Sequence, residues 1–100
     1  KDIKKLQETI KLYEENDDWQ LYLWKEDDDI VGIIGIVIED DETAILQHVS
    51  VNPSFRNQGL GKKMLIALND LIGETFEILP NKHTRSFYEK CFIDEDEKLQ

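Results

Sequence analysis

Cysteine, proline and long apolar runs are scarce in this sequence, and each absence excludes a class of protein. The single cysteine, Cys91, can form no disulfide within the chain and no cysteine-rich zinc site. His48 and His83 have no carboxylate at metal-ligand spacing, so we expect no metal. No apolar run approaches the roughly 20 residues that span a bilayer, and the first residues are amphipathic rather than signal-like. We therefore expect a cytoplasmic protein.

Positive charge is scarce as well. The formal net charge is −10, and residues 1–55 carry 14 acidic and 5 basic side chains. Residues 56–90 reverse this balance, with 6 basic and 4 acidic side chains. Nucleic acids and anionic membranes are bound through extended basic surfaces, so we expect neither as a partner. A small polyanion bound at the locally positive segment is compatible with this distribution.

Length and hydrophobic periodicity predict one α+β domain covering residues 1–100. Apolar residues make up 40% and charged residues 34% of the chain, as in globular domains. Short acidic turns between the first three strands predict an antiparallel meander, with a turn at residues 25–29. The predicted elements are helices over about residues 2–15, 60–72 and 84–91, and strands over 19–24, 30–38, 43–51 and 75–79. We expect the helices to cover a mainly antiparallel sheet, with Gly32 and Gly35 marking close backbone approach or a bulge.

The segment between the third strand and the second helix has the composition of an anion site. Gly59 and Gly61 allow positive φ angles and let a ligand approach without meeting a Cβ. The first amides of a helix have no acceptor within it and lie at the positive end of its dipole. Arg56 and Lys62 add charge to such a turn. The alternative is a plain strand-to-helix loop with solvated lysines; neither the dinucleotide nor the P-loop glycine pattern fits.

Two motifs in this sequence resemble those of one enzyme family. Val-Asn-Pro at residues 51–53, followed by Arg-x-x-Gly-x-Gly at residues 56–61, resembles the acetyl-CoA signature of GNAT acyltransferases. Asn-x-x-Thr-x-x-x-Tyr-Glu-Lys at residues 81–90 is similar to the second motif of that family. Among its members, residues 23–27 and 48–53 are most similar to the RibT-type proteins encoded with bacterial riboflavin genes.

The resemblance implies a GNAT-like fold that is shortened at the C-terminus and lacks the first strand. It also implies N-acetyltransferase activity, with acetyl-CoA as cosubstrate and a small-molecule or protein amine as acceptor. The strand end would pair with the pantetheine amides, the turn amides would hold the pyrophosphate, and Asn81 would hydrogen-bond the pantetheine arm. The implied cofactor-binding residues are Val49, Ser50, Val51, Arg56, Asn57, Gln58, Gly59, Leu60, Gly61, Lys62 and Asn81.

The resemblance also implies catalytic roles near the second motif. Tyr88 would protonate the departing CoA thiolate, although a half-buried packing role is equally compatible with its position. By strand position rather than by resemblance, His48 is a candidate general base, with Glu39 as the other nearby choice and water as a relay. Thr84 replaces the usual alanine and would crowd the cofactor side slightly. Cys91 shares a helical face with Phe87, which favours packing over reactivity.

Two other classes of function remain open from the sequence. A shortened GNAT domain would serve as a binding module that senses acetyl-CoA or regulates a partner without turnover. A homodimer formed through an unpaired sheet edge is the third possibility. Turnover with a panel of amines separates the enzyme from the binding module.

Overall fold

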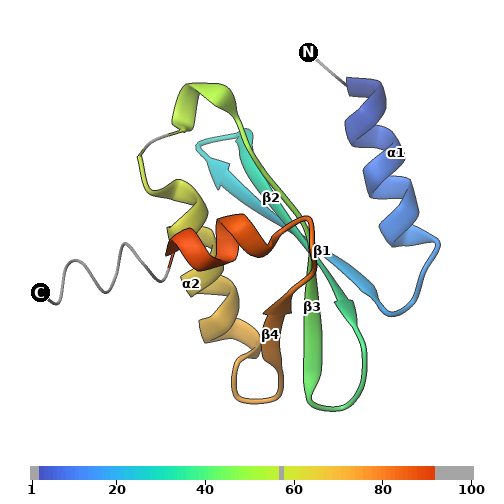
Figure 1. Ribbon diagram of the computed structural model, residues 1–100. Helices are drawn as coiled ribbons and strands as arrows, with labels where there is room; N and C mark the ends of the chain where they lie inside the picture. Colours follow the sequence, from blue (N-terminus) through green and yellow to red (C-terminus); the bar gives the residue numbers. More distant parts are fainter. Residues whose placement is uncertain (1–2, 57, 92–100) are drawn as a thin grey trace, which may run out of the picture.

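The computed structural model describes residues 3–56 and 58–91, and it shows a four-stranded sheet flanked by helices (Figure 1). In chain order the elements are α1 (Ile3–Glu14), β1 (Trp19–Glu26), β2 (Asp29–Ile38), β3 (Thr43–Val51), the short 3-10 helix η1 (Pro53–Phe55), α2 (Leu60–Ile72) and β4 (Glu77–Pro80). Residues 85–91 form a further helix. The predicted α+β class is confirmed.

The sheet has the strand order β1-β2-β3-β4. The first two neighbouring pairs are antiparallel, so the predicted meander is confirmed. β4 then returns from α2 to pair with β3 in parallel, because the helix carries the chain back along the sheet before the last strand starts. In Figure 1, β4 lies beside the lower part of β3 and is much shorter than it.

Two predicted boundaries were wrong. The turn predicted at residues 25–29 is only Asp27-Asp28, since β1 and β2 extend to a two-residue hairpin in which Asp27 has a φ of 55°. Positive φ suits this short hairpin, and Asp tolerates it. The last strand begins at Glu77 rather than residue 75, because the amides of Thr75 and Phe76 both donate to the carbonyl of Ile72 at the end of α2.

The two long helices cover opposite faces of the sheet. A Cβ at Gly32 would lie 2.5 Å from Sδ of Met64 in α2, whereas a Cβ at Gly35 would overlap the Tyr13 ring of α1. Residues three apart in a strand point to opposite faces. The close neighbour of each glycine is therefore a side chain from a different helix, and the bulge named as the alternative lies beside Gly35.

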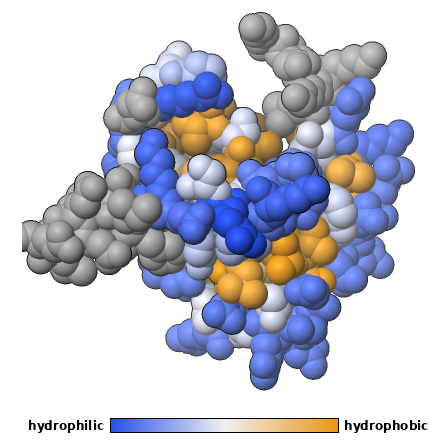
Figure 2. Space-filling model, viewed as in Figure 1, coloured by the Kyte–Doolittle hydropathy of each residue, from blue (hydrophilic) through white to orange (hydrophobic). Residues whose placement is uncertain are grey.

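The main core lies on the α2 face. Ile36 and Leu46 are fully buried there, together with Met64 and Leu68 of α2. The apolar spacing of α2 produces this buried stripe, and Gly73 ends the helix as predicted. Figure 2 shows separate apolar patches among hydrophilic surface on the viewed face, rather than one continuous apolar area.

A β-bulge interrupts β3. Leu46 pairs with Ile36 and His48 pairs with Gly35, so Gln47 is an extra residue in β3. Strict alternation would place Leu46 and His48 on one face. With the bulge, Leu46 faces α2, while His48 faces α1 and contacts Tyr13.

Candidate functional site

The N-terminus of α2 carries free backbone donors. Gly59 is the N-cap residue, with a φ of 73°, and no side chain of the described residues caps it. The first intrahelical bond runs from the amide of Lys63 to the carbonyl of Gly59, at 3.0 Å, which leaves the amides of residues 60–62 without an acceptor in the helix. The positive φ predicted for Gly59 is confirmed. A Cβ at this position would meet nothing within 4 Å, so the space above the turn is open.

The positive φ that the sequence allowed at Gly61 is not observed, whereas its role in cofactor binding stays a prediction. It lies inside α2 without a positive φ, and a Cβ there would come within 2.6 Å of the Phe87 ring. Its lack of a side chain therefore lets the helix at residues 85–91 approach α2 closely. The sequence could not show this, because the two residues are brought together only by the packing of two helices.

A hollow of about 460 Å³ opens in front of this turn. It lies between β3, α2 and the helix at residues 85–91. The charged side chains that line it are Arg56, Lys62 and Lys90, all of them basic in a chain with a net charge of −10. Lys90 was not predicted as a binding residue, although it is the lysine of the second motif. The three basic side chains and the amides of residues 60–62 can all donate hydrogen bonds to a phosphate-containing ligand.

The remaining predicted turn residues have local structural roles. The Arg56 side chain folds back, and its Nε donates to the Val51 carbonyl at 3.2 Å. Gln58 donates from Nε2 to the Ser54 carbonyl at 3.3 Å. Leu60 is buried in the core and anchors the start of α2. Asn57 lies outside the described residues.

The strand end predicted to hold the pantetheine has an unpaired edge. β4 ends at Pro80, which pairs with Leu46, so within the described chain residues 48–51 of β3 pair with β2 only and the bulge residue Gln47 pairs with neither strand. Ser50 is exposed, whereas Val49 and Val51 are half-buried against the core. Packing and an open backbone edge thus coexist at this strand end, as the sequence allowed.

Side chains tie the helix at residues 85–91 to β3 where the strands separate. Asn81 Oδ1 accepts from the amides of His83 and Thr84, and Nδ2 donates to Gln47 Oε1 at 3.3 Å. The buried Thr84 hydroxyl donates to the Leu46 carbonyl at 2.8 Å and accepts from the Asn81 amide. Thr84, expected only to crowd the cofactor, therefore links β3 to the loop after β4.

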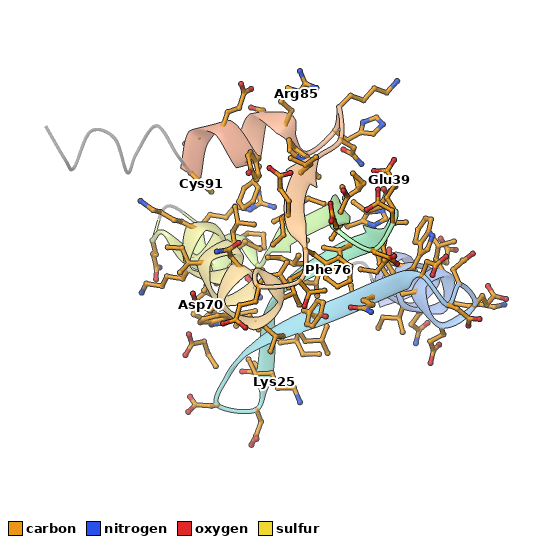
Figure 3. The ribbon with its side chains drawn as sticks, turned by 90° about the horizontal axis from the view of Figure 1, so that it is seen from below. Lys25, Glu39, Asp70, Phe76, Arg85 and Cys91 are labelled. Carbon is orange, nitrogen blue, oxygen red and sulfur yellow. The ribbon has the colours of Figure 1, made fainter. Side chains whose placement is uncertain are left out.

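Tyr88 lines a cavity of about 250 Å³ between α2, β4 and its own helix. Burial raises the pKa of its hydroxyl, and the negative charge of Glu77 raises it further. The phenol is therefore protonated at neutral pH, as a proton donor must be. Cys91, beside it, is buried in the core, which confirms the predicted packing. In Figure 3, the Cys91 end of this helix lies over α2, and Arg85 points away from the sheet.

His48 lies on the other face of the sheet. Its Nδ1 is 2.6 Å from the Tyr13 hydroxyl, and burial lowers the pKa of the imidazole. The structure therefore does not place His48 and Tyr88 side by side. Glu39, the other base candidate, is exposed in the β2–β3 turn, and Figure 3 labels it there. The contact between His48 and Tyr13 was not predicted, because it joins residues 35 positions apart.

Two further properties concern the described residues. No group of three or more histidine, cysteine, aspartate or glutamate side chains among them is arranged to hold a metal ion. None of the helices they form is both long enough and apolar enough to cross a membrane.

Comparisons with known proteins agree with this geometry. Residues 2–92 match the model of the acetyltransferase (GNAT) family. An uncharacterized N-acetyltransferase in the lysA 3′ region of Bacillus methanolicus is 50% identical over 93 residues, covering 93% of this chain and 77% of the relative. This relative is not a RibT-type protein, so it lends no support to the narrower likeness.

Solved structures share the fold over part of their length. A GNAT family acetyltransferase from Elizabethkingia anophelis with acetyl-CoA bound has a TM-score of 0.61 and 26% identity, over 84% of this chain and 57% of that one. A Staphylococcus aureus GNAT family acetyltransferase has a TM-score of 0.63 and 19% identity, over 77% and 62%. The chain thus spans about three fifths of these two proteins. The matched family model and the close relative together establish that the chain belongs to the acetyltransferase (GNAT) family.

Proposed function

We propose that the protein transfers the acetyl group of acetyl-CoA to an amine, with the cofactor's pyrophosphate at the N-terminus of α2. The observation that carries this proposal is the basic hollow in front of Gly59. There, the amides of residues 60–62 have no acceptor in the helix, and Arg56, Lys62 and Lys90 line the space. Backbone amides and cations together form a strong phosphate site. The family membership of the chain supports the same ligand.

The pantetheine arm would continue along the open edge of β3. Residues 49–51 offer backbone groups to an extended ligand, as a sheet edge does to an added strand. Beyond Pro80 the sheet has a gap, bordered by Gln47 and Asn81. A ligand passing through this gap would lie between Tyr88 on one face and His48 on the other. We therefore propose that Asn81 lines this gap. When the ligand is bound, the Asn81 side-chain amide would donate to the ligand instead of to Gln47.

The chemistry requires one bond to form and one to break. The amine nitrogen attacks the thioester carbonyl carbon, and the carbon–sulfur bond breaks with its electron pair on sulfur. Tyr88, protonated at neutral pH, would give its proton to that thiolate. The proton lost by the attacking ammonium goes to His48 or to water. The likeness of residues 23–27 and 48–53 to RibT-type members does not identify the acceptor beyond an amine.

The cofactor site is tested by two substitutions at Gly59. Gly59→Val forces a β-branched residue into a positive φ, whereas Gly59→Asn tolerates that conformation and is the matched control. We expect calorimetry to show acetyl-CoA binding at least tenfold weaker in the valine variant than in the asparagine variant, a difference of about 1.4 kcal/mol. Equal affinity in both would reject the turn as the pyrophosphate site.

Tyr88→Phe separates an enzyme from a binding module. The variant keeps the ring and loses the acid, so cofactor affinity should hold while turnover with an amine panel falls by about 10² to 10⁴-fold. Thiol release measures the turnover. If the wild-type protein binds acetyl-CoA but releases no thiol with any amine, the binding-module alternative replaces the enzyme.

A further inference from the structure

Tyr13 and His48 form a contact that no other part of the site explains. Tyr13 lies near the end of α1 and is 6% exposed, and its hydroxyl is 2.6 Å from Nδ1 of His48 in β3. The Trp19 ring stands edge-on to the Tyr13 ring, with centroids 5.3 Å apart. The tyrosine is thereby held between a tryptophan and the histidine that it contacts.

The sheet leaves space for this hydroxyl. Gly35 pairs with His48 across β2 and β3, and any Cβ at Gly35 would overlap the Tyr13 hydroxyl. The bulge at Gln47 turns His48 towards the same face. A glycine and a bulge in neighbouring strands therefore both serve to bring one phenol and one imidazole together.

The hydrogen-bond pattern determines which imidazole nitrogen carries the proton. A buried hydroxyl needs an acceptor, and Nδ1 of His48 is the acceptor found for Tyr13 among the side chains that the structure describes. The Tyr13 hydroxyl therefore donates to Nδ1, and the proton of the neutral ring lies on Nε2. If Nδ1 carried a proton, it would have to donate to the Tyr13 oxygen, and the buried Tyr13 O–H would then lose the only acceptor that the described side chains give it.

The pKa shifts agree with a neutral pair. Burial lowers the pKa of His48 and raises the pKa of Tyr13 to about 12, so both groups are uncharged at neutral pH. The cause in each case is burial. Among the described residues, the contacts and the register place Tyr13 of α1 and Gly35 of β2 next to His48, with Leu21 of β1 beyond Gly35.

We propose that Tyr13 is a positioning residue that holds His48 as the neutral Nε2–H tautomer, so that the ring donates a hydrogen bond to an oxygen of the bound substrates and does not act as a base. No partner for Nε2 occurs among the described side chains, which leaves that donor for a ligand. The ammonium proton of the acceptor then goes to water. The tautomer of His48 depends only on contacts within the protein, whereas the role of His48 towards substrates rests on the proposed acetyl transfer.

The tautomer is tested without any ligand, by long-range nitrogen–proton NMR correlations of the wild-type imidazoles. There are two histidines, and a His83→Gln variant assigns the His48 signals. We expect Nδ1 of His48 to have the shift of an unprotonated nitrogen and Nε2 that of a protonated one at neutral pH. In Tyr13→Phe, the Nε2–H tautomer of His48 should become less populated and the pKa of His48 should rise, while the NMR signals of the exposed His83 should not move. A proton on Nδ1 in the wild type, or an unaltered tautomer ratio in the variant, would overturn the proposal.

Kinetics test the donor role separately. His48→Gln retains an N–H donor near the position of Nε2 but cannot take up a proton, whereas His48→Leu loses both functions. We expect turnover of the leucine variant to be about 10 to 10²-fold below that of the glutamine variant. Equal losses in the two variants would support a base and refute the donor. Absence of turnover in the wild type would instead reject acetyl transfer and leave the NMR result in force.

Discussion

The two halves of β3 differ in what lies along their outer edge. Residues 43–46 pair with β4 on one side, residues 44–46 also pair with β2 on the other, and Ala44 and Leu46 are fully buried. Residues 48–51 pair with β2 alone, the bulge residue Gln47 pairs with neither strand, and the side chains of residues 47–51 are half-buried or exposed. The bulge at Gln47 marks the change. One strand thus contributes its first half to the core and leaves the second half with free backbone groups for a ligand.

The largest expected effect on stability concerns residues 43–46, the first half of β3. Leu46→Ala removes a fully buried side chain from the core, and we expect the free energy of unfolding to fall by about 2–5 kcal/mol. The matched control is Leu71→Ala, because Leu71 is 67% exposed and should lose about 0.5 kcal/mol or less. Urea denaturation measures both. Similar losses in the two variants would mean that the first half does not carry the core.

Residues 47–51, the second half of β3, should instead become more protected from hydrogen exchange when the cofactor binds. At a hundredfold excess over its dissociation constant, a ligand that binds only the folded state adds about 2.7 kcal/mol of stability. We expect acetyl-CoA to slow hydrogen exchange at amides of residues 47–51 by up to about 100-fold where they face the open edge. Amides of residues 43–46 that already pair with β4 should gain less. Uniform protection of both halves would contradict the proposed difference.

The boundary between the halves is tested at Thr84. Thr84→Val keeps the side-chain shape but removes the hydroxyl that joins the Leu46 carbonyl and the Asn81 amide. We expect a loss of about 1–3 kcal/mol in the free energy of unfolding, because buried polar groups lose their partner. The exposed Thr75 provides the control, as Thr75→Val should change stability little. A negligible loss at Thr84 would show that this link does not hold the strands together.

The smallest effect concerns the contact that Tyr13 makes with the second half. Its pKa is about 12 when folded and about 10 when unfolded, so the unfolded state loses the proton first. The stability that the raised pKa of Tyr13 contributes is fully present below pH 10 and is lost as pH rises towards 12. Urea midpoints over this range should fall less steeply for Tyr13→Phe. Tyr22→Phe is the comparison, since burial raises the pKa of Tyr22 by less and this variant should flatten the fall less; equal slopes in the two variants would refute this.

Much of the fold was predictable because its signals are local. Residues 43–51 were predicted as a strand and residues 60–72 as a helix, and both boundaries are confirmed. Alternation of apolar side chains, the Asn52-Pro53 stop and Gly73 each act within a few residues. The same holds for Gly59, whose positive φ follows from one turn. The binding residues assigned by family resemblance stay predictions until the cofactor is bound.

Other features depended on contacts between distant segments. The face of His48 was open in the sequence, because one extra residue in a strand reverses every side chain after it and the bulge is decided by pairing with β2. Lys90 joins the basic hollow only because its helix crosses α2 at Gly61 and Phe87.

The sequence by itself determined the elements, the locally positive turn and the two family motifs, since propensity, spacing and charge are properties of neighbouring residues. Only the tertiary structure decided that Tyr13 meets His48 and that Tyr88 lies on the opposite face of the sheet. It also decided that β4 stops short of the second half of β3. The physical reason is that strand register and helix packing place side chains from remote segments within hydrogen-bonding distance, and no local pattern encodes those meetings.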